Sequence, residues 1–378
     1  MISRKLLLRK LELVASAVAA HDLVPILTHV CFTGDFLLAC NDKIGIVVPL
    51  QTEFQGTIPA KMLIDMLRIA RHAAVVNLQA DGTGAVLVSL GSMRLKLETW
   101  PREKFPLRVP ALPRKNCIKG NSAKFFAAVE HCMRSVPRHC SECNQLGITL
   151  IPDGGTVSLF STDKQTLSHA KVQLPEVTRF KHCVILPAEF CRQMLRLAKA
   201  AQTTRFALHA DHAIFAADDT VLFGGLIQSN QSLDFEGTLK RCLPRGYRKV
   251  MVRIRKRQMG PILARASCIT DIIGSEKPSR ISINGGEATF CSRSKRGLVI
   301  DSMALPGHRE VESEVRVSLL LKAYASLDNV LFTPECAIMA RDDMLYLVLP
   351  HIDTERRQCN GTDAGDRCRR KQQIARCP

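Results

Sequence analysis

The sequence lacks several features, and each absence argues against a class of protein. No apolar run approaches the roughly 18 residues that a membrane-spanning helix needs. There is no glycine-rich phosphate-binding loop and no nucleophile elbow, so no motif points to a nucleotide-dependent enzyme or a hydrolase. Acidic residues are scarce, with 35 Asp and Glu against 53 Lys and Arg. The net charge of +18 favours a polyanionic partner, either nucleic acid or an acidic membrane surface.

Metal and catalytic sites also lack support. Cys140 and Cys143 have the C-x-x-C spacing, but a structural zinc site needs a second pair, and the sequence has none. The cluster at 209–212, His-Ala-Asp-His, falls where two apolar runs must turn, so we interpret it as a hairpin tip. The acidic pairs at 218–219 and 342–343 occupy similar turns, whereas a two-metal nuclease requires converging carboxylates. We therefore predict no metal, no cofactor and no catalytic residue.

The 15 cysteines do not have the spacing of a disulfide framework. Most lie inside apolar runs, which is typical of reduced thiols packed as small hydrophobic side chains. The first 20 residues have the basic and apolar character of a signal peptide, but Lys10 and Glu12 interrupt the apolar run. Leu7, Leu11 and Val14 recur at helical spacing. We interpret this segment as an amphipathic helix and expect a cytoplasmic protein.

One segment of 13 residues occurs twice. Residues 58–70 read IPAKMLIDMLRIA and residues 186–198 read LPAEFCRQMLRLA. Six positions are identical, all at an offset of 128, which is about a third of the 378 residues. Such a period indicates an internal structural repeat.

The patterns around both copies have the same order. A helix over about 4–19, three strands, the helix at 60–70 and three more strands make the first repeat, with Gly or Asp at the turns. The second repeat begins with a helix over 123–136. A third, fainter repeat has helices over 259–269 and 317–327. Half a repeat cannot bury both its helix and its sheet, but two halves placed back to back can.

The sequence therefore predicts an α+β fold of three repeated domains, each with two helices packed on two antiparallel sheets. The predicted boundaries are 1–115, 116–243 and 244–352. Residues 353–378 are basic and have no apolar period, so we expect a disordered tail.

A helical wheel places the repeated arginine on the solvent side of both helices. The predicted apolar stripe of the first copy consists of Met62, Met66, Ile69 and Ala70. That of the second copy consists of Phe190, Met194, Leu197 and Ala198. Arg68 and Arg196 lie opposite these stripes. A solvated charged face has the same appearance, but the excess of Lys and Arg indicates a track that holds DNA by its phosphates.

Five stretches, taken in order, resemble the bacterial sliding clamp family, the beta subunit of DNA polymerase III. They are VPILTHV (24–30), the IPAKMLIDMLR helix, ETWPREKFP (98–106), LFSTDKQTL (159–167) and LYLVLP (345–350). The resemblance covers about residues 5–352. It implies three clamp domains in each chain and a head-to-tail homodimeric ring lined by helices. The implied function is a non-enzymatic processivity factor that encircles duplex DNA and tethers DNA polymerase and clamp loader subunits through short peptides.

The resemblance also implies three sets of site residues. The DNA-binding residues are Arg68, Arg71, Arg196, Lys199, Arg9 and, as a looser match, Lys322. The partner-peptide groove is lined by Thr162, Leu167, Arg241, Cys242, Leu319, Leu347, Val348, Leu349 and Pro350. The dimer interface joins Phe105 and Leu107 of the first domain to Cys268 and Ile269 of the third.

The groove departs from the family pattern. Thr166 stands where the family has an arginine, and Phe235-Glu236-Gly237-Thr238 replaces the usual Phe-Pro-Asp-Tyr. The chain also continues past Ile352 into the basic tail. These changes leave open an alternative in which the protein is a clamp-fold adaptor or competitor that binds clamp-interacting peptides without closing on DNA.

Overall fold

The computed structural model describes residues 1–20, 24–106, 118–119, 123–137, 146–174, 182–209, 211–228, 233–269, 278–294 and 297–349. The chain divides into two compact units. The first unit comprises residues 1–163, 167–239 and 342–345, and the second comprises 164–166, 240–341 and the chain from 346 onward. Four features of the sequence analysis lie outside the described residues: the tail at 353–378, Leu107, Pro350 and the C-x-x-C pair. The boundaries of three domains stay a prediction.

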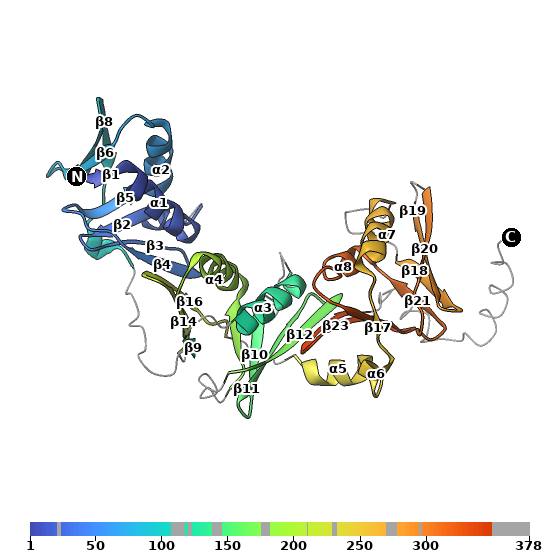
Figure 1. Cartoon of the computed structure of the whole chain (residues 1–378). Helices are drawn as coiled ribbons and strands as arrows, with labels where there is room; N and C mark the ends of the chain where they lie inside the picture. The colour runs from blue at the N-terminus through green and yellow to red at the C-terminus, as the bar shows by residue number, and fades with distance from the viewer. Residues whose placement is uncertain are drawn as a thin grey trace, which may run out of the picture. The chain divides into compact units, whose positions relative to one another are not determined.

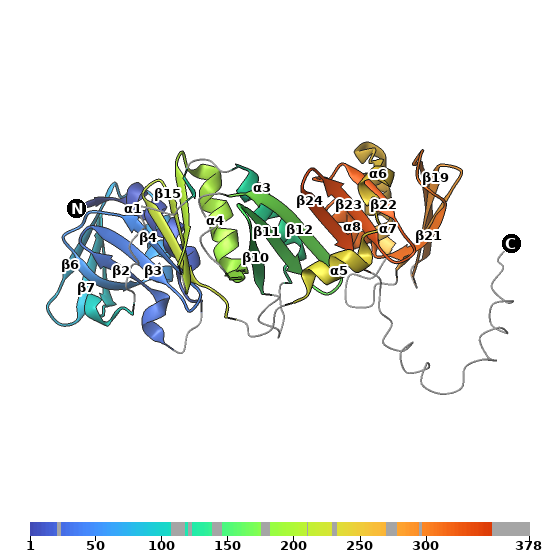
Figure 2. The ribbon, with the colours of Figure 1, turned by 90° about the horizontal axis from the view of Figure 1, so that it is seen from below.

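An eight-stranded antiparallel sheet runs through the first unit (Figure 1). Its strands are, in spatial order, β5 (Gln55–Pro59), β2 (His29–Thr33), β3 (Phe36–Cys40), β4 (Ile44–Pro49), β16 (Thr220–Gly225), β15 (His212–Ala217), β14 (Thr204–Leu208) and β9 (Ile118–Lys119). Strands β4 and β16 join the two halves, with Ile46 opposite Leu222 and Val47 opposite Val221. Figure 2 shows the yellow-green strands of this sheet beside the blue ones around β4, although about 170 residues separate β4 from β16 in the sequence.

Two further sheets complete the first unit. One has the order β1 (Ile2–Ser3), β6 (Val75–Ala80), β7 (Ala85–Leu90) and β8 (Met93–Glu98). The other contains β13 (Val184–Pro187), β10 (Gly147–Asp153), β11 (Thr156–Thr162) and β12 (Thr166–Gln173). In β8 the side chains alternate between outward and inward positions, and no strand of the described chain pairs with its outer edge. This edge is therefore available for pairing.

The helices of the first unit cover one face of the eight-stranded sheet. They are α1 (Arg4–Val14), continued by η1 (Ala15–Ala17), α2 (Ala60–Ile69), α3 (Ala123–Cys132), continued by η4 (Met133–Ser135), and α4 (Ala188–Ala200). Ile46 and Leu222 are paired across β4 and β16, and both belong to the core beneath the helices. Val47 belongs to a separate cluster on the opposite face. Because the pairing keeps the two halves in register, α1, α2 and α4 lie on the same side of the sheet (Figure 1).

The second unit repeats the same kinds of element. Strands β24 (Met344–Val348), β23 (Ala337–Arg341), β22 (Asn329–Phe332) and β17 (Val252–Arg253) are neighbours in that order. A four-stranded sheet contains β20 (Gly297–Ala304), β19 (Glu287–Ser294), β18 (Ser279–Asn284) and β21 (Val311–Val315). The helices are α6 (Tyr247–Val250), α7 (Lys256–Ile269) and α8 (Val317–Leu321), and α5 (Phe235–Cys242) ends in this unit. The α+β class with antiparallel sheets is thus confirmed.

The prediction of three strands for each half-repeat was wrong, because every half has a fourth. A short strand precedes each of the six predicted helices and pairs with the sheet of the other half of its repeat. The pairs are β1 with β6, β5 with β2, β9 with β14, β13 with β10, β17 with β22, and β21 with β18. Four of these six strands have only two to four residues, too few for a visible alternation of apolar and polar side chains. The exchange ties the two halves of each repeat together.

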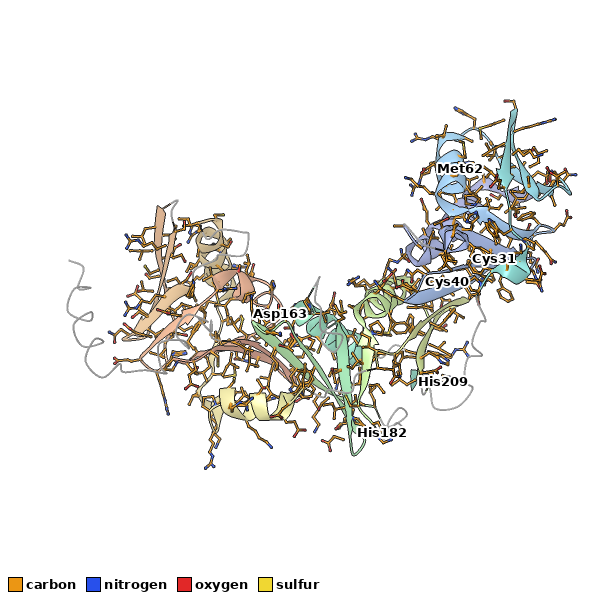
Figure 3. The ribbon with its side chains drawn as sticks, turned by 180° about the vertical axis from the view of Figure 1, so that it is seen from behind. Cys31, Cys40, Met62, Asp163, His182 and His209 are labelled. Carbon is orange, nitrogen blue, oxygen red and sulfur yellow. The ribbon has the colours of Figure 1, made fainter. Side chains whose placement is uncertain are left out.

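The buried face of α2 also differs from the prediction. Ala60, Leu63, Ile64 and Leu67 are buried, whereas Met62 and Ile69 are 46% and 72% exposed. Figure 3 labels Met62 on this helix. Both sets of side chains are spaced as one helical face, and the leucine and isoleucine face is the one that packs on the sheet. In α4 the prediction holds, because Phe190, Met194 and Leu197 are buried and Ala198 packs against the core.

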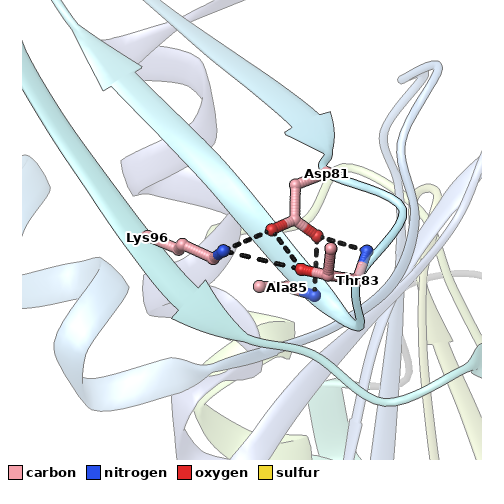
Figure 4. A network of polar contacts seen from close by, with 4 residues as sticks. All are labelled: Asp81, Thr83, Ala85 and Lys96. Atoms are coloured by element: carbon pink, nitrogen blue, oxygen red, sulfur yellow. Dashed lines mark hydrogen bonds and ion pairs between the residues drawn. The ribbon is translucent and has the colours of Figure 1, made fainter.

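The hairpins are set by polar turn residues. Asp81, at the β6–β7 turn, accepts hydrogen bonds from the backbone N–H groups of Thr83 and Ala85 at 2.8 and 3.1 Å (Figure 4). Its carboxylate also pairs with Lys96 of β8 at 2.7 Å. The ammonium group of Lys96 and the hydroxyl of Thr83 hold the pKa of Asp81 below its usual range. Asp218 and Asp342 adopt positive φ at their turns, which confirms both as turn residues.

Candidate functional site

Helices α1 to α4 carry a strongly cationic exposed surface. Nine Lys and Arg residues on or directly after these helices are exposed, against two exposed acids, Glu12 and Glu130, within the described residues. The nine are Lys5, Arg9, Lys61, Arg68, Arg71, Lys124, Arg192, Arg196 and Lys199. We call this set the cationic helix surface. It contains five of the six predicted DNA-binding residues. The four members that the sequence analysis did not select are Lys5, Lys61, Lys124 and Arg192.

The two repeated arginines contact the end of the same helix. On α2, Arg68 forms an ion pair with Glu12 at 2.9 Å, with both side chains about half exposed. From α4, Arg196 donates from Nη2 to the carbonyl oxygen of Leu13 at 2.9 Å and to the hydroxyl of Ser16 at 3.0 Å. The carbonyl groups in the last turn of a helix lack partners within the helix. Arg196 therefore caps α1 and complements the negative end of its dipole.

These contacts leave the surface positive. Lys199 lies 3.3 Å from Glu130 of α3, again with both side chains more than half exposed. Pairs of this kind contribute at most about 1 kcal/mol, because water solvates each charge nearly as well as its partner does. Phosphate groups can therefore compete for the same cations. Burial lowers the pKa of Arg196, but an arginine stays protonated at neutral pH.

The second unit holds the sixth predicted DNA-binding residue. Lys322 directly follows α8 and is exposed. The second unit also contains a dense basic run at 248–258, whose residue pattern fits either a phosphate contact or a solvated strand edge. Part of it forms β17, which pairs with β22 and has no strand on its other side among the described residues. Lys256 of this run pairs with Asp328 at 2.7 Å.

The predicted groove residues divide into surface and core positions. Thr162, Cys242 and Leu349 are partly exposed, and Arg241 is exposed. The remaining described members of the groove are at least 95% buried: Leu167, Leu319, Leu347 and Val348. These four contribute packing rather than exposed surface, and the groove itself stays a prediction.

The predicted dimer residues lie in three environments. Phe105 is only 6% exposed and packs in a cluster with Ile26 and Cys31 of its own chain. Cys268 is exposed and Ile269 is half-buried, in the last turn of α7. Because Phe105 is already covered, it has little surface left for a second chain.

An edge strand that the sequence analysis did not select has more exposed apolar surface. Strand β20 lies at the edge of its sheet, and its Leu298 and Ile300 are 54% and 62% exposed. An exposed apolar edge strand is a liability unless another chain covers it. The sequence did carry a signal for this strand, the apolar run of residues 298–300. Backbone pairing with β19 does not require apolar side chains, so the run indicates a further contact.

Within the described residues there is no group of three side chains suited to hold a metal ion. In the same part of the chain, no helix is long and apolar enough to cross a membrane. His209 and His212, which we interpreted as a hairpin tip, do flank the turn between β14 and β15, with their rings stacked at 4.6 Å.

The chain is similar to known clamp proteins along most of its length. Residues 1–110 match the family described as DNA polymerase III beta subunit, N-terminal domain. The beta sliding clamp of Pseudomonas aeruginosa is 24% identical over 327 residues, which is 84% of this chain and 83% of that protein. The crystal structure of the DNA polymerase III subunit beta from the same organism has a TM-score of 0.77 at 20% identity, with 92% of this chain and 98% of that chain covered.

A second solved structure shares the fold. The Helicobacter pylori beta clamp bound to a DNA ligase peptide has a TM-score of 0.76 at 18% identity, with the same coverage of 92% and 98%. The matched family, the related sequences and the common fold agree with the repeated helices and the cationic helix surface. Residues 1–110 thus match the N-terminal domain of the DNA polymerase III beta subunit, and the chain shares the fold of the bacterial sliding clamps.

Proposed function

We propose that this protein closes as a head-to-tail homodimeric ring around duplex DNA and tethers replication proteins to it. The cationic helix surface carries this proposal. Nine exposed cations against two acids, on helices that cover one face of a continuous sheet, suit a phosphate backbone. Helices packed flat against a sheet insert no element into a DNA groove, so the contact would be independent of base sequence.

The mechanism would be topological rather than catalytic. A closed ring cannot leave a long duplex, so it needs no tight contact with any one site. Weak phosphate contacts permit sliding, and a polymerase tethered to the ring has a raised effective concentration at the primer end. The half-exposed ion pairs of Arg68 and Lys199 fit such weak contacts, because their cations can exchange between carboxylate and phosphate partners.

Two edge strands that pair on one side only within the described residues support closure between copies. Each chain has β8 at one sheet edge and β20 at another. If β8 of one copy pairs with β20 of the next, the contact is head-to-tail, and two copies can satisfy both edges of each other. The exposed Leu298 and Ile300 would then be covered. Cys268, exposed on α7, stays a predicted member of this interface.

Partner proteins would bind through short peptides. The relative from Helicobacter pylori was solved with a DNA ligase peptide. The predicted groove of this chain retains an exposed Arg241 and partly exposed Thr162, Cys242 and Leu349. Thr166, which stands where the family has an arginine, is fully buried. It would therefore affect a bound peptide only through the packing of the residues around it.

The mass of the protein in solution tests closure. Sedimentation equilibrium is expected to give about twice the chain mass of 41.9 kDa. Ile300→Lys, which places a charge on the β20 edge, is expected to give the mass of a single chain. Phe36→Lys is the matched control, since Phe36 is 46% exposed on β3, an interior strand. A single-chain mass for the unchanged protein would contradict closure and favour the adaptor that binds peptides without encircling DNA.

A further inference from the structure

Two cysteines far apart in the sequence meet in the second unit. Cys242 is the last residue of α5, and Cys336 directly precedes β23. The Cys336 thiol donates to the carbonyl oxygen of Cys242 at 3.5 Å, which places the two cysteines side by side. Because 94 residues separate them, this contact depends on the folded structure.

The turn that carries Cys336 is held in place. The backbone N–H of Cys336 donates to the hydroxyl of Thr333 at 2.9 Å, and the N–H of Thr333 donates to the carbonyl of Cys336 at the same distance. Cys336 itself is 1% exposed. It is therefore a fixed and shielded thiol that only a group already beside it can reach.

Cys242 has the environment of a reactive thiol. It is partly exposed, next to the guanidinium of Arg241. Interaction with the neighbouring Cys336 thiol stabilises the Cys242 thiolate, which lowers the pKa of Cys242 and raises that of Cys336. A thiolate with some access to solvent is the form of cysteine that peroxides attack. Of the nine cysteines in the described chain, Cys242 combines partial exposure with a neighbouring thiol.

We propose that Cys242 and Cys336 are a modification site, which hydrogen peroxide converts to a reversible disulfide. The Cys242 thiolate attacks one peroxide oxygen, the O–O bond breaks, and the departing hydroxide takes up a proton to become water. This leaves Cys242 as a sulfenic acid. The Cys336 sulfur then attacks the Cys242 sulfur, the S–O bond breaks, and the thiol proton leaves with the hydroxide as a second water. Two thiols and one peroxide thus give one disulfide and two waters.

The disulfide would change the surface around Arg241. Cys242 belongs to the predicted partner-peptide groove, so bond formation withdraws its thiol from that surface toward the buried Cys336. Oxidation is then expected to weaken the binding of partner peptides. This consequence rests on the proposed function, whereas the disulfide itself does not.

Peptide mapping of the full chain tests the site. The protein is treated with peroxide, its remaining thiols are alkylated, and it is digested with trypsin. The expected product joins residues 242–245 to residues 323–341, and dithiothreitol separates them. Cys336→Ser is expected to lose this product and leave a Cys242 sulfenic acid that dimedone traps. Cys183→Ser, which removes an exposed cysteine outside every predicted site, is the control and is expected to retain the product.

The proposal is overturned if Cys242 and Cys336 are both fully alkylated after a peroxide treatment that oxidises the exposed Cys183. The groove consequence has its own readout, the affinity of a fluorescent copy of the Helicobacter pylori DNA ligase peptide. A loss of affinity on oxidation, absent in Cys336→Ser, supports the coupling. Equal affinity with the disulfide present refutes the coupling and leaves the site intact. No binding by the reduced protein would instead count against the proposed groove.

Discussion

His131 is expected to make the protein sensitive to acid. It lies in the last turn of α3 and is 1% exposed. Its Nε2–H donates to the carbonyl oxygen of Leu345 at 2.7 Å, and its Nδ1 accepts from the Arg134 guanidinium at 3.1 Å. The ring is therefore neutral in the folded protein. Burial, together with the positive charge of Arg134, lowers the pKa of His131 to about 4.

The sign and size of the effect follow from the two states. In the unfolded chain the pKa of a histidine is about 6.5, so the unfolded state takes up a proton first as the pH falls. The stabilisation is complete above about pH 6.5 and is lost progressively toward the folded pKa of about 4. Between about pH 7.5 and pH 5 the loss amounts to roughly 2 kcal/mol of the free energy of unfolding.

Urea unfolding, followed by circular dichroism at a series of pH values, measures this loss. In His131→Gln the amide nitrogen can still donate to Leu345 and the amide oxygen can still accept from Arg134, but the side chain does not titrate. We expect the stability of the wild-type chain to fall by about 2 kcal/mol more than that of the variant over this range. His72→Gln, at an exposed histidine, is the control. Parallel curves for wild type and His131→Gln would refute the reasoning.

Three further predictions concern the DNA surface, a turn and a strand pair. Replacing Arg68 and Arg196 together by Ala is expected to reduce the slope of log K for duplex DNA against log salt concentration by about 2. Arg205→Ala, on the opposite face of the sheet, is expected to leave this slope unchanged. An equal effect of both replacements would contradict the surface assignment. Asp81→Asn is expected to speed hydrogen exchange of the backbone amides in the β6–β7 turn at neutral pH. This difference in exchange rate from wild type is expected to vanish as the pH falls through the lowered pKa of Asp81. Gly147→Ala is expected to lower the free energy of unfolding by about 1–3 kcal/mol, measured in thermal melts. The reason is that a Cβ at this position would lie 2.1 Å from a backbone carbonyl oxygen of β13. An unchanged melting temperature would contradict this packing.

The sequence predicted the long, strongly patterned elements well. The helix at 186–198 was assigned both its position and its buried face, because charged residues left one apolar stripe. Its copy at 58–70 was assigned its position but the wrong face, since Leu63 and Leu67 compete there with Met62 and Ile69 at the same spacing. Only packing against the sheet decides between two such stripes.

Short and long-range features could not be predicted. Strands such as β1 and β17 have two residues each and form only because a longer strand offers its edge. The contact of Arg196 with Leu13 joins residues 183 positions apart, and no local pattern announces it. The resemblance supplied the groove residues, but it did not separate exposed members such as Arg241 from buried ones such as Leu347.

Retention on DNA tests encirclement most directly. The protein is incubated with linear duplex whose ends are open, both ends are then blocked with biotin and streptavidin, and the sample is passed through a gel-filtration column at a salt concentration that disrupts phosphate contacts. A closed ring is expected to remain on the blocked DNA and to be released when a restriction enzyme cuts that DNA. Loss of the protein from blocked and open DNA alike would contradict a ring around the duplex.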